Sequence, residues 1–124
     1  MGIGWSEGVV KRGMTVQRFP DITATNAARI FGLYPKKGVI SPGSDADLVF
    51  IDPSIRKTLS REDFQVADYS PWEGWEVSGW PVTTILRGRV IADHGKLLGS
   101  TSDGRWLPRK IDGAVLARPI SEGR

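Results

Sequence analysis

The chain has 124 residues, of which 40% are hydrophobic and 25% charged, which excludes general disorder and allows one domain with a buried core. The net charge is +3 and the basic residues are interspersed along the chain, so a nucleic-acid partner is not expected. No apolar run approaches the roughly twenty residues that span a bilayer, the N-terminus lacks a signal-peptide layout, and there is no cysteine. We therefore expect a cytoplasmic protein with no membrane partner.

The first part of the chain, residues 5–33, has a helical pattern. Ser6 is the expected N-cap of a short helix, which Gly13 ends. A second segment follows, and Pro20 interrupts or restarts it because proline has no amide proton. The pattern therefore predicts helices separated by a glycine turn.

The next helix is expected over residues 26–31. Thr25 precedes it, and Gly32 follows it where a left-handed C-cap is favoured. These helices need something to pack against, and that partner need not be part of this chain.

After residue 36 the pattern changes to short extended segments separated by turns. The apolar run over residues 46–51 predicts a buried strand, and Asp52-Pro53 is expected to turn the chain so that residues 55–59 pair back on it. Further strands joined by tight turns are expected at residues 82–86, 89–92 and 96–98.

Three segments follow from these patterns, with a compositional boundary near residue 36. Residues 1–36 form a helical segment, and residues 37–99 form an antiparallel β-unit of four to six strands. Residues 100–124 form a tail that is extended or lies against a neighbour. The predicted fold class is mixed α and β.

Few residues offer catalytic or metal-binding chemistry. His94, the one histidine, stands in a predicted turn without visible ligand partners, whereas a zinc site needs three or four converging ligands. Asp45 and Asp47 could together hold a cation, but we favour turn chemistry, with Asp45 accepting hydrogen bonds from local backbone amides. No catalytic or metal-binding residue is assigned.

The stretch YSPWEGWEVSGWPV, residues 69–82, contains Trp72, Trp75 and Trp80. Its nearby acidic residues argue against stacking on nucleic-acid bases, and its glycines, prolines and polar residues argue against an interior strand. Tryptophan is favoured at interfaces, so we expect this loop to be covered by another domain or subunit, with burial in the domain's own core as the alternative. Tyr69 and Trp106 complete the interface candidates.

Several motifs in order resemble the C-terminal region of dihydropyrimidinases and D-hydantoinases, which are cyclic amidohydrolases. The resemblance extends from about residue 4 to residue 109. The helix ending in Gly-Leu and the Gly-Ser-Asp-Ala-Asp-Leu motif are shared across the amidohydrolase superfamily, whereas Tyr-Ser-Pro-Trp-Glu-Gly and Gly-Trp-Pro point to the hydantoinase branch. The motifs that carry it are Ser6–Val9, Arg18-Phe19, Thr25–Leu33, Pro35–Gly38, Pro42–Val49, Asp68–Gly74, Gly79–Pro81 and Arg87–Val90.

The resemblance implies a fold, and it implies that the catalytic residues lie upstream of the matched motifs. Residues 1–31 would correspond to the closing helices of a metal-bearing (β/α)₈ barrel, and residues 38–98 to the C-terminal share of a small β-sandwich built from both chain ends, a composite domain. Such enzymes hydrolyse ring amides at a two-metal site, usually zinc, whose ligands would all lie upstream of the matched motifs. This chain would then be catalytically silent alone, with the rest of the barrel or identical chains as partners.

Two other hypotheses stay open at this point. The chain could be a free-standing β-rich interaction module that self-associates through the tryptophan loop and the tail. It could also derive from a non-catalytic relative, such as the dihydropyrimidinase-related cytoskeletal signalling proteins.

Overall fold

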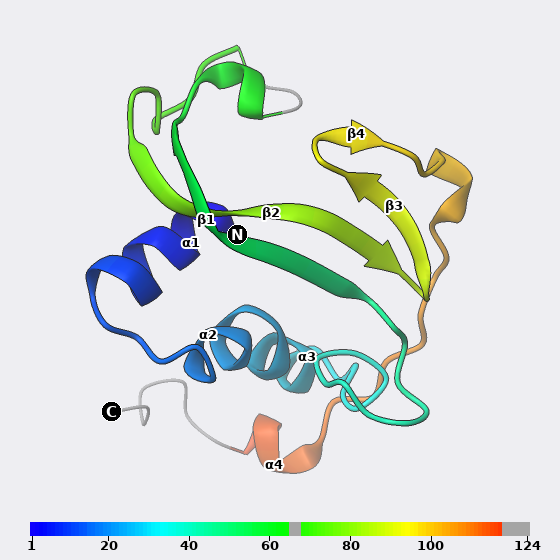
Figure 1. The fold of residues 1–124 in the computed structure, drawn as a ribbon. Coiled ribbons are helices and arrows are strands. Elements are labelled where there is room, and N and C mark those ends of the chain that lie inside the picture. The colour runs from blue at the N-terminus through cyan, green and yellow to red at the C-terminus, as the bar shows by residue number, and fades with distance from the viewer. Residues whose placement is uncertain (65–67, 118–124) are drawn as a thin grey trace.

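The computed structural model describes residues 1–64 and 68–117, which form a four-stranded sheet and two helical bodies (Figure 1). The first body begins with α1 (Gly2–Gly4) and continues as a wider π-type helix over Trp5–Lys11. The second joins α2 (Arg18–Pro20), a π-type stretch over Asp21–Thr25 and α3 (Asn26–Ile30). The mixed α and β fold class is confirmed.

The helix ends follow the glycine and proline signals, but the predicted N-cap at Ser6 is wrong. Gly32 has φ +68°, as a left-handed C-cap requires, and Pro20 lies in the first turn of its helix, where no amide proton is needed. Ser6 and Thr25 instead lie inside helices and bind distant backbone groups. The buried Ser6 Oγ accepts a hydrogen bond from Ser78 N at 3.0 Å, and Thr25 Oγ1 donates to the Gly38 carbonyl at 2.7 Å.

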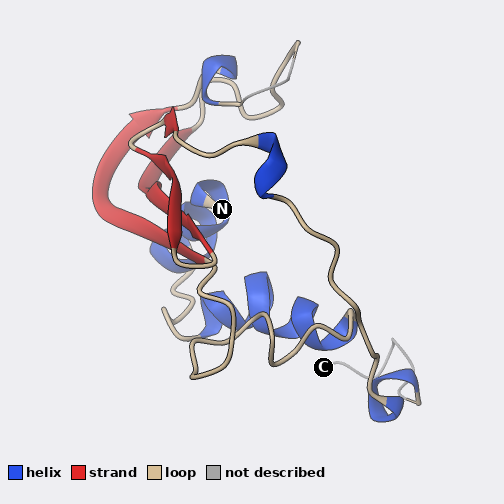
Figure 2. Cartoon of the chain, turned by 90° about the vertical axis from the view of Figure 1, so that its right-hand side faces the viewer, coloured by secondary structure: helices blue, strands red, loops and turns tan. Residues whose placement is uncertain are grey.

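The sheet has the strand order β1-β2-β3-β4, and every neighbouring pair is antiparallel. Its strands are β1 (Leu48–Thr58), β2 (Glu76–Leu86), β3 (Arg89–Asp93) and β4 (Lys96–Leu97). The sheet lies above the α2–α3 body, while α1 contacts β2 (Figures 1 and 2). The three later predicted strands are therefore confirmed, although β2 begins earlier than expected.

The prediction that Asp52-Pro53 reverses the chain is wrong. Residues on both sides of it pair with β2, Asp52 with Trp80 and Arg56 with Ser78, across a register shift. Asp52 Oδ1 accepts hydrogen bonds from the backbone and the hydroxyl of Ser54, which fixes an irregular local backbone. Within the described residues β1 is an edge strand, where a bulge accommodates a proline without loss of a ladder hydrogen bond.

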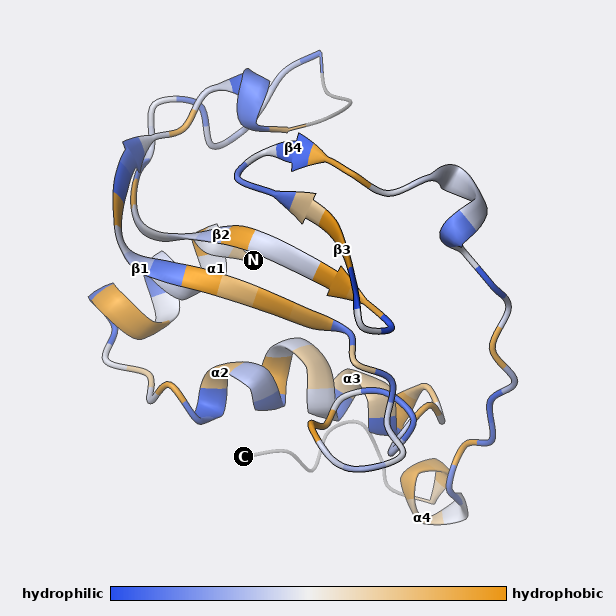
Figure 3. Ribbon diagram, turned by 45° about the vertical axis from the view of Figure 1, so that its right-hand side comes forward, coloured by the Kyte–Doolittle hydropathy of each residue, from blue (hydrophilic) through white to orange (hydrophobic). Residues whose placement is uncertain are grey.

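The core is small, and its buried hydrophobic residues come from α2, α3, the start of β2 and the position after β1. The Trp5 ring meets Phe19 edge-on, with centroids 5.5 Å apart and planes at 88°. The buried hydrophobic residues are Phe19, Ala28, Leu59 and Val77. The predicted burial of residues 46–51 is wrong for this chain, since Val49 and Phe50 are exposed and β1 presents a continuous hydrophobic stretch (Figure 3).

The C-terminal segment runs back along the chain's own helices. It contains a short 3₁₀ turn at Thr101–Asp103 and α4 (Gly113–Leu116). Lys110 N donates to the Gly32 carbonyl at 3.0 Å, an approach so close that a Cβ at Gly32 would overlap the Lys110 backbone. Residues 118–124 of the predicted tail lie outside the described residues. None of the described helices is long and apolar enough to cross a membrane.

Candidate functional site

The connection between β1 and β2 carries most of the predicted interface residues. We call its described part, residues 59–64 and 68–75, the aromatic loop. Its base is closed by two backbone hydrogen bonds, from Leu59 N to the Trp75 carbonyl at 2.8 Å and from Gly74 N to the Leu59 carbonyl at 2.9 Å. Leu59 is buried, so the loop is anchored to the core.

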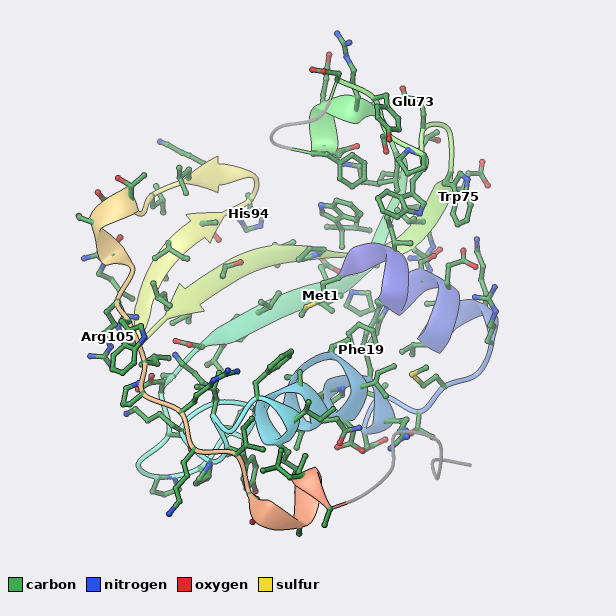
Figure 4. All side chains as sticks on the ribbon, turned by 180° about the vertical axis from the view of Figure 1, so that it is seen from behind. Met1, Phe19, Glu73, Trp75, His94 and Arg105 are labelled. Carbon is green, nitrogen blue, oxygen red and sulfur yellow. The ribbon has the colours of Figure 1, made fainter. Side chains whose placement is uncertain are left out.

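The aromatic side chains of this loop are partly or largely open to solvent. Trp72 is 38% exposed, Trp75 44% and Tyr69 77%. Trp72 also packs on Phe64, with ring centroids 5.8 Å apart and planes tilted by 37°. The loop therefore presents a group of aromatic rings at one end of the molecule, where Figure 4 labels Glu73 and Trp75.

Trp80 belongs to a different environment from its neighbours. It lies in β2, so the prediction that this stretch is all loop is wrong for residues 76–81. A Cβ at Gly2 would lie closer than 3.0 Å to the Trp80 ring, and Lys57 Nζ lies 4.7 Å from its centroid. Trp80 thus packs against this chain's own first helix.

Trp106 is the most exposed of the predicted interface residues, at 84%. It follows Arg105, whose guanidinium lies 3.6 Å from Asp45 Oδ1. Figure 4 places Arg105 across the molecule from Glu73 and Trp75. The structure therefore does not bring Trp106 together with the aromatic loop.

Asp45 and Asp47 are engaged by cations and backbone. Asp45, with a side chain 6% exposed, lies 2.6 Å from Lys36 Nζ and 2.8 Å from Lys37 Nζ, the latter as an ion pair without hydrogen-bond alignment. Lys37 also pairs with Asp47, whose Oδ1 accepts from Arg87 N at 2.8 Å. The expected Asx-type turn at Asp45 is therefore wrong, because its carboxylate bonds to lysines.

These contacts shift the ionisation of the cluster. The ammonium groups of Lys36 and then Lys37, paired with the Asp45 carboxylate, hold the pKa of Asp45 well below its usual range, against the opposing effect of desolvation. For Lys37, desolvation lowers the pKa, but the neighbouring carboxylates of Asp45 and Asp47 outweigh it and raise the pKa above its usual value. We call Lys36, Lys37, Asp45 and Asp47 the charged clamp. It lies at the start of β1 and is joined to the β2–β3 turn by the hydrogen bond from Arg87 N to Asp47.

His94 lies in the exposed turn between β3 and β4. Its Nδ1 is 3.2 Å from Asp93 Oδ1, and the same carboxylate oxygen accepts from Thr83 Oγ1 at 2.6 Å. The hydrogen bond from Thr83, and then that from His94, lower the pKa of Asp93. Across residues 1–64 and 68–117, no three His, Asp or Glu side chains converge as metal ligands, so these residues do not fit a two-metal centre.

An open groove of about 700 Å³ separates the α2–α3 body from β1. The sequence analysis did not predict this groove, although the apolar run over residues 46–51, which contributes to its lining, could have indicated it. The polar end of the groove is formed by the charged clamp. Its apolar lining includes Phe19, Val39, Ile40, Val49, Phe50 and Ile51.

The family model described as "Amidohydrolase family" matches residues 5–91, which include α2, α3, the charged clamp, β1, β2 and the start of β3. The chain belongs to the amidohydrolase family.

Hydantoinases are similar in sequence to this chain over most of its length. It is 41% identical over 118 residues to the D-hydantoinase of Geobacillus stearothermophilus, covering 94% of this chain and 25% of that enzyme. It is 41% identical over 111 residues to the D-phenylhydantoinase of Escherichia coli O1:K1, covering 89% of this chain and 24% of that enzyme. The predicted similarity to the hydantoinase branch is confirmed.

The fold agrees with a solved member of the same group. The chain matches the crystal structure of dihydropyrimidinase from Brevibacillus agri with a TM-score of 0.85 at 38% identity, covering 95% of this chain and 25% of that protein. The chain therefore spans about a quarter of the length of the relatives that it matches.

Proposed function

We propose that this chain is the C-terminal segment of a hydantoinase- or dihydropyrimidinase-like hydrolase of cyclic amide C–N bonds, and that it has no catalytic residues of its own. The observation that supports this most is the match over 94% of this chain to only 25% of a D-hydantoinase. The other hypotheses, a free-standing module and a non-catalytic relative, are not favoured, because the matched relatives are named as hydantoinases and dihydropyrimidinases.

In this proposal the metal centre, with zinc as the expected metal, belongs to barrel residues outside this chain. The charged clamp supports a structural role for its two carboxylates. Asp45 is paired with lysine, and Asp47 is paired with lysine and accepts a backbone hydrogen bond. The helices before residue 36 would close the barrel, and the sheet would form part of a composite β-sandwich. A cytoplasmic location remains part of the same proposal.

The exposed edge strand supports the composite domain. Among the described residues β1 pairs with β2 alone, and its Val49 and Phe50 are exposed although the sequence there is typical of a buried strand. We assign the covering of β1 and of the groove to strands from the other end of the complete enzyme.

A turnover assay tests the catalytic part. The purified chain, supplied with Zn²⁺ and a hydantoin or a dihydropyrimidine, should release product no faster than Zn²⁺ alone, and a His94→Ala chain should behave identically. The D-hydantoinase of Geobacillus stearothermophilus is the positive control. Turnover by the chain at an enzyme-like rate, lost in His94→Ala, would show that it carries its own centre.

A chimera tests the structural part. Replacing the matched quarter of that D-hydantoinase with this chain should give a folded enzyme that retains hydantoin hydrolysis. A chimera that does not fold, while re-insertion of the enzyme's own segment by the same junctions does, contradicts the structural equivalence.

A further inference from the structure

The segment after β4 crosses from the sheet to the end of α3, and we call residues 99–112 the strap (Figure 2). It begins on the sheet, because Gly99 N donates to the Ile91 carbonyl at 2.9 Å. The carboxylate of Asp103 then pairs with Arg89 of β3 at 2.6 Å. These contacts fix the first part of the strap to β3.

The middle and the end of the strap are attached to other parts of the chain. Arg105 lies 3.6 Å from Oδ1 of Asp45 in the charged clamp. Lys110 N donates at 3.0 Å to the carbonyl of Gly32, which follows α3. The strap therefore joins the sheet, the charged clamp and the helix end, and all three attachments lie within this chain. They do not depend on which surfaces the rest of the enzyme covers.

Gly32 makes the last attachment possible. A Cβ at this position would lie 2.5 Å from the Lys110 carbonyl carbon, which is closer than two non-bonded carbons approach. Gly13 follows the first helical body with the same φ of +68°, yet an added Cβ there would meet no heavy atom within 4 Å in the described part of the chain. The two glycines thus share a backbone conformation, but only Gly32 makes room for the strap.

The strap bridges a part of the molecule where the α2–α3 body and the sheet lie apart, on either side of the groove of about 700 Å³. Elsewhere the two are linked through Trp5, which packs on Phe19 of α2 and against Gly79 of β2. Figure 4 places Arg105 well away from Phe19. A link at one place allows two bodies to hinge about it, whereas a second, distant attachment prevents that motion.

We infer that the strap fixes the α2–α3 body to the sheet. While its attachments at Asp45 and Gly32 are made, the two parts move as one unit, and when these attachments open the parts hinge about the contact between Trp5 and Phe19. The inference concerns the geometry of this chain, and it does not depend on whether the complete enzyme hydrolyses cyclic amides.

Amide hydrogen exchange in the complete 124-residue chain tests the last attachment. The Lys110 amide should be protected in the unaltered chain, and Gly32→Ala should lower its protection by at least about tenfold because the added Cβ displaces the strap. Gly13→Ala is the matched control, with the same backbone cost, and should leave that protection unchanged. An unprotected Lys110 amide in the unaltered chain, or equal protection in the two variants, would overturn the inference.

The distance between two spin labels tests the hinge. The sequence has no cysteine, so Ile22→Cys on the α2–α3 body and Lys96→Cys on β4 give two unique labelling sites. The distance distribution from electron paramagnetic resonance should be narrow with the native strap and with Gly13→Ala, and clearly broader with Gly32→Ala. Distributions of equal width in all three chains would show that the strap does not hold the two parts together.

Arg105→Gln keeps both tests decisive if circular dichroism shows that Gly32→Ala does not fold. It removes a half-exposed ion pair, so the protection of the Lys110 amide should fall by about two- to fivefold and the distance distribution should broaden. Arg109→Gln is its control, because it removes the same charge from an exposed residue of the strap between the two attachments. Equal effects of the two arginine variants would contradict the attachment at Asp45 and, with it, the inference.

Discussion

Gly79 is the position at which the packing of the first helix on the sheet can be tested most directly. It is buried in β2 with φ +85°, a conformation that residues with a Cβ adopt at a cost of about 1–2 kcal/mol. A Cβ there would also lie closer than 3.0 Å to Cδ1 and Nε1 of Trp5, whose ring is held by Phe19. Overpacking of this kind costs about 1–3 kcal/mol.

Gly79→Ala should therefore lower the free energy of unfolding by about 2–5 kcal/mol. Gly88 in the β2–β3 turn is the matched control, because it has φ +82° and no heavy atom within 4 Å of an added Cβ. Gly88→Ala should cost only the conformational part, about 1–2 kcal/mol. Urea unfolding followed by circular dichroism, at one low protein concentration, measures both.

The packing part can be isolated by a double-mutant cycle with Trp5. In a Trp5→Leu background, Gly79→Ala should cost no more than Gly88→Ala does, because the indole that it meets has been removed. Equal costs for the two glycine variants in the unaltered background would refute the contact between the first helix and β2.

Three further predictions concern single side chains. Ser6→Ala leaves the partly buried Ser78 N–H without its acceptor and should cost about 1–3 kcal/mol in urea unfolding, whereas a neutral effect would contradict the buried hydrogen bond. Leu59→Ala should cost about 2–5 kcal/mol because Leu59 is fully buried, and the exposed Leu97→Ala is its control; similar losses for both would contradict the anchoring of the aromatic loop. Because the pKa of Asp45 is lower in the folded chain, its stabilisation is present above the unfolded value of about 3.9 and is lost as the pH falls below it. The melting temperature of Asp45→Asn should therefore fall less steeply than that of the unaltered chain below about pH 4, and parallel curves would contradict this assignment.

The sequence by itself determined that helices precede a set of antiparallel strands, and it located several of the turns between them. Glycines and prolines act through local backbone preferences, so the C-cap at Gly32 and the turn at Arg87-Gly88 could be predicted without knowing what lies nearby. The ordered motifs also determined the family resemblance. These signals depend only on neighbouring residues.

Tertiary structure decided which partner each polar or aromatic side chain takes. Ser6 resembled an N-cap, but it bonds to Ser78, 72 residues away, and local sequence contains no information on that distance. Trp80 resembled its neighbours in a loop, yet pairing with β1 made it part of a strand. Pro53 resembled a turn, yet the edge position of its strand removes the cost of a missing amide proton. In each case a long-range contact outweighed a local preference worth no more than about 1–2 kcal/mol.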